Sequence, residues 1–307
     1  MEPLDLVDIA VLLTYERTST DARFRNAKLK DFSYSKPTGS IVIDMEKHPE
    51  ETDTTPDTAS NILPLDPCPK LAALSSKEQE TIFHQVRGHD GRYTSTALLQ
   101  HFFDQYPPDT PLHVRHLKKS DSYTTVIKQR VICEIKLNKP TYNILTRVTP
   151  GEETYASGFE PTQLHSHIMI APTSAAGRDF SKTFLDLASM RYGDVGRGFK
   201  GKALFVLDTA EEYDQRLPRM CRGPPDYNMK TSARIGPMPT DAWLKEVAAR
   251  VKERWENRER EKWCGHCGAP APKSRCSRCK QVWFCGEEHQ KATWPFHKVY
   301  CISESGT

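Results

Sequence analysis

Strongly β-branched and alternating stretches recur between residues 40 and 207. Residues 40–45 (SIVIDM) alternate between apolar and polar positions, which predicts a strand. Residues 164–171 (LHSHIMIA) predict a second strand, and the continuous apolar run 203–207 (ALFVL) predicts the most buried one. Residues 123–135 and 142–148 are also rich in β-forming residues, and because only a short turn region separates them they predict a β-hairpin.

Other stretches follow the helical period instead. Ser75 and Glu78 have the spacing of a capping box ahead of the apolar residues Ile82, Phe83 and Val86, which predicts a helix start. Apolar residues from 97 to 103 predict a second short helix that ends before the prolines 107–108. Residues 180–190 (FSKTFLDLASM) show a helical stripe and predict a third helix.

The alternation of strand and helix patterns predicts an α+β organisation, a mixed α/β domain over residues 1–235 whose topology the patterns leave open. Within it, residues 46–68 are rich in Glu, Asp, Thr and Pro and predict an acidic loop or linker. Residues 215–239 are rich in Pro, Arg and Gly and predict an irregular connector. Residues 236–263 predict an amphipathic helix whose last part, 256–262 (ENREREK), is almost wholly charged and is interpreted as a spacer. Residues 264–301 form a separate, cysteine-rich segment.

Hydrophobic content, the N-terminal sequence and net charge limit the classes of protein to which the chain can belong. The 307 residues include 37% hydrophobic residues, and no apolar run reaches the roughly 18 residues of a membrane span. The N-terminus lacks the basic and apolar regions of a signal peptide, so we expect an intracellular protein of the nucleus or the cytoplasm. The formal net charge is +3. It would fall to about +1 if six thiolates bound two Zn²⁺ ions, so global charge gives no case for DNA binding.

Six of the nine cysteines lie in residues 264–301, together with two suitably spaced histidines. The eight residues are Cys264, Cys267, Cys276, Cys279, Cys285, His289, His297 and Cys301. They form two C-x2-C pairs, one C-x3-H pair and one H-x3-C pair, which is the number of ligands that two tetrahedral zinc ions need. Such clustering favours metal over disulfides, and the scattered Cys68, Cys133 and Cys221 are interpreted as buried or inert thiols. A segment this short cannot build a sufficient apolar core, so metal must supply much of its stability.

This segment resembles a MYND-type zinc finger. The resemblance rests on the two C-x2-C knuckles, on Phe284 before Cys285, and on the series Gln290, Trp294, His297 and Cys301. One departure is His289, which stands where the family usually has Cys, although imidazole also binds zinc well. The match covers about one eighth of the chain, residues 264–301 of 307.

The resemblance implies cross-braced ligand pairing. Zinc 1 would be held by Cys264, Cys267, Cys285 and His289, and zinc 2 by Cys276, Cys279, His297 and Cys301. Spacing alone leaves sequential pairing open. In either case the four protein ligands of each ion leave no open position, so both ions would be structural. His266, between two ligands, is interpreted as facing solvent.

The resemblance also implies a docking surface for short, often proline-containing peptides, with Gln290 and Trp294 as candidate partner-binding residues. Basic residues outnumber acidic ones in the segment, which leaves acidic peptides or nucleic acid as further partners. Protein is the favoured partner, because no base-reading recognition helix is apparent. Membrane is not an expected partner, and the oligomeric state stays open.

Three other motifs carry weaker signals. Residues 196–202 (GRGFKGK) have the spacing of a phosphate-binding loop, but Ala203 replaces the Mg²⁺-binding hydroxyl and a strand follows, so this interpretation is rejected. His165 and His167 lie on one face of a strand and could join a metal or acid–base site, although satisfied histidines are the simpler interpretation. The basic run 113–119 (HVRHLKK) is interpreted as a solvated loop.

The sequence therefore favours a zinc-binding adaptor, a regulator linked to transcription or to ubiquitin, over an enzyme, and no catalytic residues are assigned. The first alternative is an enzyme with its active site in residues 110–240 and the finger as a targeting module; a pocket joining His165, His167 and a carboxylate such as Asp208 would favour it. The second alternative is direct nucleic-acid binding.

Overall fold

The structure is a computed structural model, and it describes residues 2–36, 38–47, 56–172, 182–224 and 226–303. The α-helices are α1 (Leu6–Ser19), α2 (Pro69–Ala72), α3 (Ser76–Arg87), α4 (Gly91–Phe103), α5 (Ala210–Met220), α6 (Asp241–Glu256) and α7 (Glu287–Tyr300). The strands are β1 (Leu4–Asp5), β2 (Ala27–Ser35), β3 (Ser40–Lys47), β4 (Pro111–Val114), β5 (Tyr123–Val126), β6 (Arg130–Asn138), β7 (Asn143–Thr149), β8 (Glu153–Ser157), β9 (Thr162–Ile170), β10 (Thr183–Asp186), β11 (Val206–Thr209), β12 (Asp226–Ser232), β13 (Ser274–Arg275) and β14 (Trp283–Phe284). Short 3-10 helices lie at Ala22–Phe24, Ala59–Asn61, Lys119–Asp121 and Ser189–Gly196.

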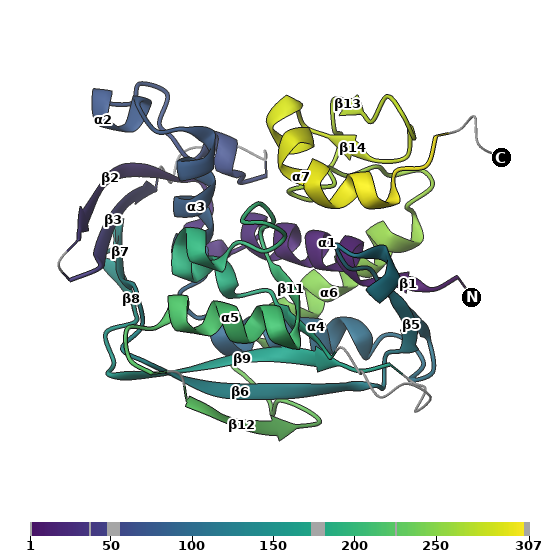
Figure 1. The fold of residues 1–307 in the computed structure, drawn as a ribbon. Helices are drawn as coiled ribbons and strands as arrows, with labels where there is room; N and C mark the ends of the chain where they lie inside the picture. The colour runs from purple at the N-terminus through teal and green to yellow at the C-terminus, as the bar shows by residue number, and fades with distance from the viewer. Residues whose placement is uncertain (1, 37, 48–55, 173–181, 225, 304–307) are drawn as a thin grey trace.

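The largest sheet is antiparallel and has the strand order β11-β10-β9-β6-β12. Its central strand β9 shows the two-residue period of a strand covered on both faces. On one face the hydroxyl of Ser166 meets that of Thr96 on α4, with 2.9 Å between the oxygens. On the other face His167 Nδ1 lies 3.0 Å from the hydroxyl of Tyr213 on α5. The sheet therefore lies between a layer containing α4 and a layer containing α5 (Figure 1).

Helices α1, α4 and α6 share the main apolar core with one face of this sheet. All residues of α1 except Asp8 are buried, as expected for a helix that is apolar around most of its circumference and sits at the centre of a core. Asp5 caps the helix by accepting hydrogen bonds from the backbone N–H groups of Val7 and Asp8. Helix α6 presents Leu244, Val247 and Val251, all fully buried, to the same core.

The second sheet has the order β2-β3-β7-β8 and packs against α3 over a core of its own. Helix α3 begins with the predicted capping box: Ser75 Oγ accepts from the Glu78 N–H at 3.3 Å, and a Glu78 carboxylate oxygen accepts from the Ser75 N–H at 2.9 Å. A smaller sheet, β1-β4-β5, completes the mixed helix and sheet architecture that the sequence predicts. We call the described residues of 2–256 the body, and residues 264–301 the finger.

Several local predictions are confirmed and several are wrong. The strands over 40–45, 164–171 and the end of 203–207 exist as β3, β9 and β11, and the two helices predicted near Ser75 and residues 97–103 exist as α3 and α4. The predicted hairpin is wrong, because β6 pairs with β9 and β12 whereas β7 pairs with β3 and β8. The connecting residues instead hydrogen bond to the segment after α5: the Thr141 N–H donates to the Met220 carbonyl, and the Arg222 N–H to the Lys139 carbonyl. These bonds fix the connection along which the chain passes from β6 of the largest sheet to β7 of the second sheet.

The helix predicted over residues 180–190 is also wrong. Residues 180 and 181 lie outside the described residues, and Thr183–Asp186 form β10, which pairs with β9 on one side and β11 on the other. All four residues of β10 are buried, so tertiary pairing overrides the helical period. The irregular connector predicted over 215–239 is partly regular, because it contains the end of α5 and strand β12.

The acidic stretch 46–68 and the charged stretch 256–262 are also more structured than their composition suggests. Residues 48–55 lie outside the described residues. Asp57, by contrast, is buried and pairs with Arg87 at 3.4 Å. The charged residues after α6 form a turn rather than a helical spacer, and Arg258 there forms a salt bridge with Glu2. No helix among the described residues is long and apolar enough to cross a membrane.

Candidate metal centre

The finger is built from two tight knuckles, a short β-hairpin and helix α7. Strands β13 and β14 pair so that Ser274 faces Phe284 and Arg275 faces Trp283. Each C-x2-C pair is closed by a turn in which a backbone N–H donates to the first cysteine carbonyl: Gly268 to Cys264 at 2.8 Å, and Lys280 to Cys276 at 2.9 Å. Gly268 has φ +79°, and a Cβ there would come within 2.7 Å of the Val11 carbonyl oxygen of α1. Glycine is thus required both by the turn and by the close approach of the body.

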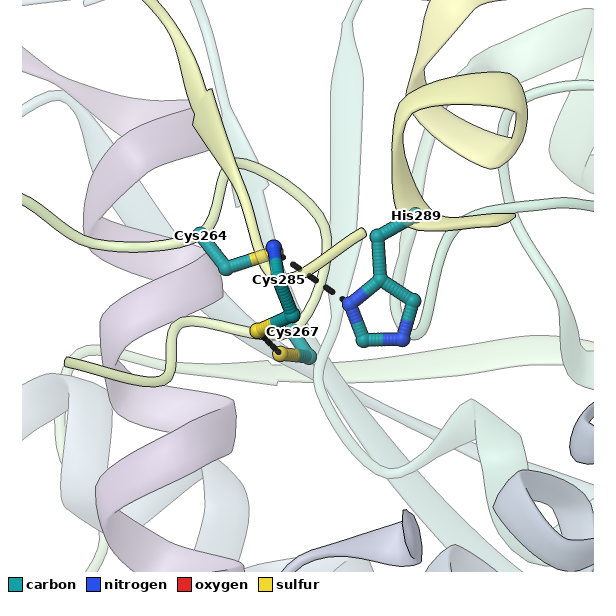
Figure 2. A group of neighbouring side chains, drawn as sticks. All are labelled: Cys264, Cys267, Cys285 and His289. Carbon is teal, nitrogen blue, oxygen red and sulfur yellow. Dashed lines mark hydrogen bonds between the residues drawn. The ribbon is translucent and has the colours of Figure 1, made fainter. Parts of the chain in front are cut away.

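Cys264, Cys267, Cys285 and His289 come together in one group, which we call cluster 1; Figure 2 shows their side chains converging. The Sγ atoms of Cys267 and Cys285 are 3.7 Å apart, and Sγ of Cys264 lies 3.3 Å from Nδ1 of His289. A tetrahedral zinc with Zn–S bonds of about 2.3 Å would set its sulfurs about 3.8 Å apart. A disulfide would need about 2.0 Å. The donor atoms therefore have the spacing of a tetrahedral zinc site.

Cys276, Cys279, His297 and Cys301 form the second group, cluster 2. The Sγ atoms of Cys276 and Cys301 are 3.7 Å apart, and Sγ of Cys279 lies 3.5 Å from Nε2 of His297. All four side chains are buried, whereas in cluster 1 only Cys264 is buried and the other three are partly exposed. In each cluster the donor atoms lie within 4.8 Å of one another, so both offer three thiols and one imidazole at metal-binding distance.

The grouping follows the cross-braced order that the family pattern implies and not the sequential order that spacing had left open. Each cluster joins one knuckle to a second pair of residues: Cys285 with His289 in cluster 1, and His297 with Cys301 in cluster 2. In each second pair the histidine lies in α7 and the cysteine lies just outside the helix, before it in the case of Cys285 and after it in the case of Cys301. Four protein donors in each group leave no open coordination position, which is the arrangement of a structural rather than a catalytic site.

His266 does not face solvent, and that expectation is corrected. Its side chain is buried, and its Nε2 lies 2.8 Å from a carboxylate oxygen of Glu80 on α3. The reason is that the finger packs against the body, so a position exposed in an isolated finger becomes an interface position. The sequence carried no signal for this contact, because Glu80 is 186 residues away along the chain.

Three further contacts help to hold the finger against the body. Phe296 of α7 stacks on Phe199, with ring centroids 4.5 Å apart. The hydroxyl of Tyr300 donates to the His116 carbonyl oxygen at 2.6 Å. Arg254 of α6 donates to the carbonyl oxygen of Gly268 at 2.8 Å. In Figure 1 the finger (yellow) accordingly lies against α1, on the opposite side of the molecule from β12.

The predicted partner-binding residues lie on α7. Trp294 is 40% exposed, and its ring makes an edge contact with His297 of cluster 2. Gln290 is partly exposed. The basic side chains of the finger are all exposed; these are Lys273, Arg275, Arg278, Lys280, Lys291 and Lys298. The described finger therefore exposes one large aromatic side chain and more basic than acidic side chains.

The strand histidines do not form the pocket that would favour an active site. His165 and His167 are both buried, and His165 Nε2 lies 2.7 Å from a carboxylate oxygen of Asp186. Asp208 instead pairs with Arg216 at 2.7 Å. Burial lowers the pKa of His167 to about 3, so this imidazole is neutral and packed beneath α5. Neither histidine lines the cavities beside Glu80, Arg17, Tyr93, Tyr106 or Arg197 in the described part of the chain.

The loop with phosphate-binding spacing has a structural role instead. Its Phe199 supports Phe296 of the finger, and its Arg197 pairs with Glu80 at 2.6 Å. Of the scattered cysteines, Cys133 and Cys221 are buried as expected and Cys68 is exposed. Burial raises the pKa of the Cys133 thiol to about 11, which makes it unreactive. Within residues 113–119, His116 is buried and meets the Thr183 hydroxyl, so this run is not wholly solvated.

Comparison with known proteins identifies the finger and leaves the body unassigned. Residues 264–301 match the family model of the MYND finger. The Dauer abnormal formation protein 25 of Caenorhabditis elegans is 46% identical over 39 residues, which are 13% of this chain and 10% of that protein. Egl nine homolog 1 of Homo sapiens is 39% identical over 44 residues, 14% of this chain and 10% of that protein. No solved structure gives a significant match. The chain thus carries a MYND-type zinc finger and spans about a tenth of the curated relatives that it matches.

Proposed function

We propose that the finger holds two structural zinc ions and that the chain acts as an adaptor, docking partner proteins through the exposed side of α7. Zinc 1 would be bound by the four residues of cluster 1 and zinc 2 by the four residues of cluster 2. The spacing of the donors and the match to the MYND finger support this assignment. The ions would hold the fold together and would take no part in chemistry.

The docking proposal depends on which side of α7 packs against the body and which side is exposed. One side of the helix packs on the body through Phe296 and Tyr300. Trp294 stays 40% exposed, and it is the one large apolar side chain in the described finger that is exposed. Aromatic side chains of this kind are enriched among the residues that dominate binding energy at interfaces. Gln290, one helical turn earlier, could donate and accept hydrogen bonds to a peptide backbone beside it.

We further propose short, proline-containing peptides as the partners, and a regulatory role linked to transcription or ubiquitin in the nucleus or the cytoplasm. The first follows from the MYND resemblance, because an extended proline-rich peptide loses little entropy when it docks on an aromatic surface. The names of the two relatives do not describe a partner, so they add nothing to this assignment.

Two measurements on the full-length chain test these proposals. Metal analysis should give two zinc ions per chain, and a lower content would contradict the eight-ligand assignment. A library of proline-containing peptides should then bind the wild type but not Trp294→Ala. Tyr34→Ala is the matched control, since Tyr34 is an aromatic residue with 49% exposure on β2 of the body. Equal peptide capture by wild type and Trp294→Ala would exclude this face of α7 as the docking site.

A further inference from the structure

A third group of metal-binding residue types lies where cluster 1 meets the body. It comprises Glu80 of α3 with His266 and His289 of the finger, and one donor atom from each lies within 4.8 Å of the others. His289 belongs to this group and to cluster 1 at the same time. Among the described residues, cluster 2 has no such extension into the body. The two clusters therefore differ in what surrounds them.

Glu80 is buried and reaches the finger through a fixed set of bonds. One carboxylate oxygen lies 2.8 Å from His266 Nε2, and the other accepts a hydrogen bond from Arg197 Nη1 at 2.6 Å. Arg197 also donates to the carbonyl oxygen of Lys77 and to the hydroxyl of Thr81. The carboxylate is thus held rigidly by α3 and the loop after the 3-10 helix Ser189–Gly196. Its position relative to cluster 1 is set by the fold of the body.

The two imidazoles place cluster 1 directly beside this carboxylate. His266 lies in the knuckle between Cys264 and Cys267, so a bond to its ring holds the knuckle itself. The rings of His266 and His289 have centroids 4.8 Å apart. Nδ1 of His289 faces Sγ of Cys264, so its Nε2 is left for a second partner. Histidines that bind zinc usually donate the N–H of their other nitrogen to a carboxylate, carbonyl or water, which fixes the ring and its tautomer.

We infer that Glu80, a residue of the body, is a positioning residue for cluster 1: its charge stabilises the imidazole of His289 from within 4.8 Å, while a direct bond to His266 holds the carboxylate in place. Retention of the ion in cluster 1 then depends on this carboxylate of the body, whereas retention in cluster 2 does not. This also gives the histidine at the sixth ligand position a physical role. A cysteine there would offer no second nitrogen to a carboxylate. The inference rests on the proposal that cluster 1 binds zinc.

The same three side chains could instead hold a third metal ion, but the surroundings disfavour it. Arg197 already occupies the second carboxylate oxygen of Glu80 with a fixed positive charge. A divalent cation at this position would lie close to that guanidinium, and the repulsion would be strong at low local dielectric. Two zinc ions per chain, and not three, is therefore the expected content.

Zinc release from the full-length chain tests the inference. Purified wild type and Glu80→Gln, each loaded with zinc, are mixed with the chromogenic chelator 4-(2-pyridylazo)resorcinol, and release is followed over time. Loss of such a carboxylate partner typically costs about 10–100-fold in metal affinity. We expect one of the two zinc ions to leave Glu80→Gln about 10–100-fold faster and the other to leave at the wild-type rate. Equal rates for both ions in the two proteins would overturn the inference.

Two further variants separate positioning from simple loosening of the interface. Glu16→Gln is the control, because Glu16 is also buried and holds Arg254, which reaches the finger at the Gly268 carbonyl without touching an imidazole. It should not release one ion selectively. In a His289→Cys background, which retains a fourth zinc ligand, Glu80→Gln should no longer accelerate release. Selective release from Glu16→Gln, or undiminished acceleration in the His289→Cys background, would also overturn the inference.

A spectroscopic readout covers the case in which Glu80→Gln is less stable overall. In ¹⁵N-labelled wild type, the ring nitrogen signals of His289 should report the carboxylate charge that lies within 4.8 Å of one of its ring nitrogens. In folded Glu80→Gln these signals should shift, while the ring signals of His297 in cluster 2 stay unchanged. Unchanged ring signals of His289 would contradict the inference. A wild-type chain that binds fewer than two zinc ions would contradict the proposed function instead, so the two failures are distinguishable.

Discussion

The body and the finger reach a folded state by different physical means. The body buries three apolar clusters, represented by Leu12, Ile43 and Leu217, between its helices and sheets. In the finger's own cluster, Phe284 is the one fully buried side chain other than cysteine among the described residues. The body is therefore stabilised by removal of apolar surface from water. We therefore expect the finger to depend on metal, although Phe296 also ties it to the main core of the body. From this difference we expect two units of stability joined by an interface.

The largest expected effect comes from removing one ligand. Cys276→Ala should lose the ion of cluster 2 and unfold the finger, because a structural zinc contributes on the order of 10–16 kcal/mol of apparent binding free energy in finger peptides. The body should stay folded on its own core. Hydrogen exchange should therefore show lost protection in residues 264–301 and retained protection in α1 and β9. Cys133→Ala is the matched control: it removes a fully buried thiol that belongs to neither cluster, so it should keep both ions. If Cys276→Ala unfolds the body as well, the two units form one cooperative fold.

The interface between the two units should respond to Phe296→Ala. This change removes a 6% exposed ring that stacks on Phe199, and truncations of this kind typically cost about 3–5 kcal/mol. We expect the finger to keep two zinc ions but to detach more often from the body. Limited proteolysis should then cut residues 257–263 faster. Trp294→Ala on the same helix, at an exposed position, should leave the cleavage rate unchanged; cleavage of Phe296→Ala at the wild-type rate would show that the stack contributes little.

The body should also lose stability in mild acid, in part through one of its buried histidines, His167. Burial lowers the pKa of His167 from 6.5 to about 3, so protonation favours the unfolded state. The stability due to the neutral ring is complete above pH 6.5 and is lost progressively as the pH falls from 6.5 towards 3. At pH 5 the loss should be about 2 kcal/mol. Urea unfolding of the body at pH 7 and pH 5 measures it, and His167→Gln should show a correspondingly smaller difference between the two pH values.

The same division explains what the sequence could predict. The eight candidate metal-binding positions were readable from residues 264–301, because a metal site demands fixed residue types at short spacings. Their cross-braced grouping was implied only by the resemblance to the MYND-type finger, since spacing left sequential pairing open. Strands such as β9 and the capped start of α3 were readable from local periods. Local patterns did not predict the contact between Glu80 and His266, the pairing of β7 with β3, or strand β10. Each depends on partners distant in sequence, and local patterns carry no record of which segments will meet.

We expect the smallest effect from replacing Arg250, which shares its partner Glu16 with the more deeply buried Arg254. Arg250 and Arg254 both pair with Glu16. The side chain of Arg250 is 38% exposed, whereas that of Arg254 is 10% exposed. Arg254 also donates a hydrogen bond to the Gly268 carbonyl of the finger. Exposed ion pairs are worth about 0–1 kcal/mol, so Arg250→Ala should leave both the unfolding free energy and the interface cleavage rate nearly unchanged. Arg254→Ala should increase cleavage at residues 257–263, because it leaves Glu16 without its closer partner and a finger carbonyl without its donor. Equal effects of the two substitutions would mean that the salt bridge to Glu16, and not the bond to the finger, connects α6 to the second unit.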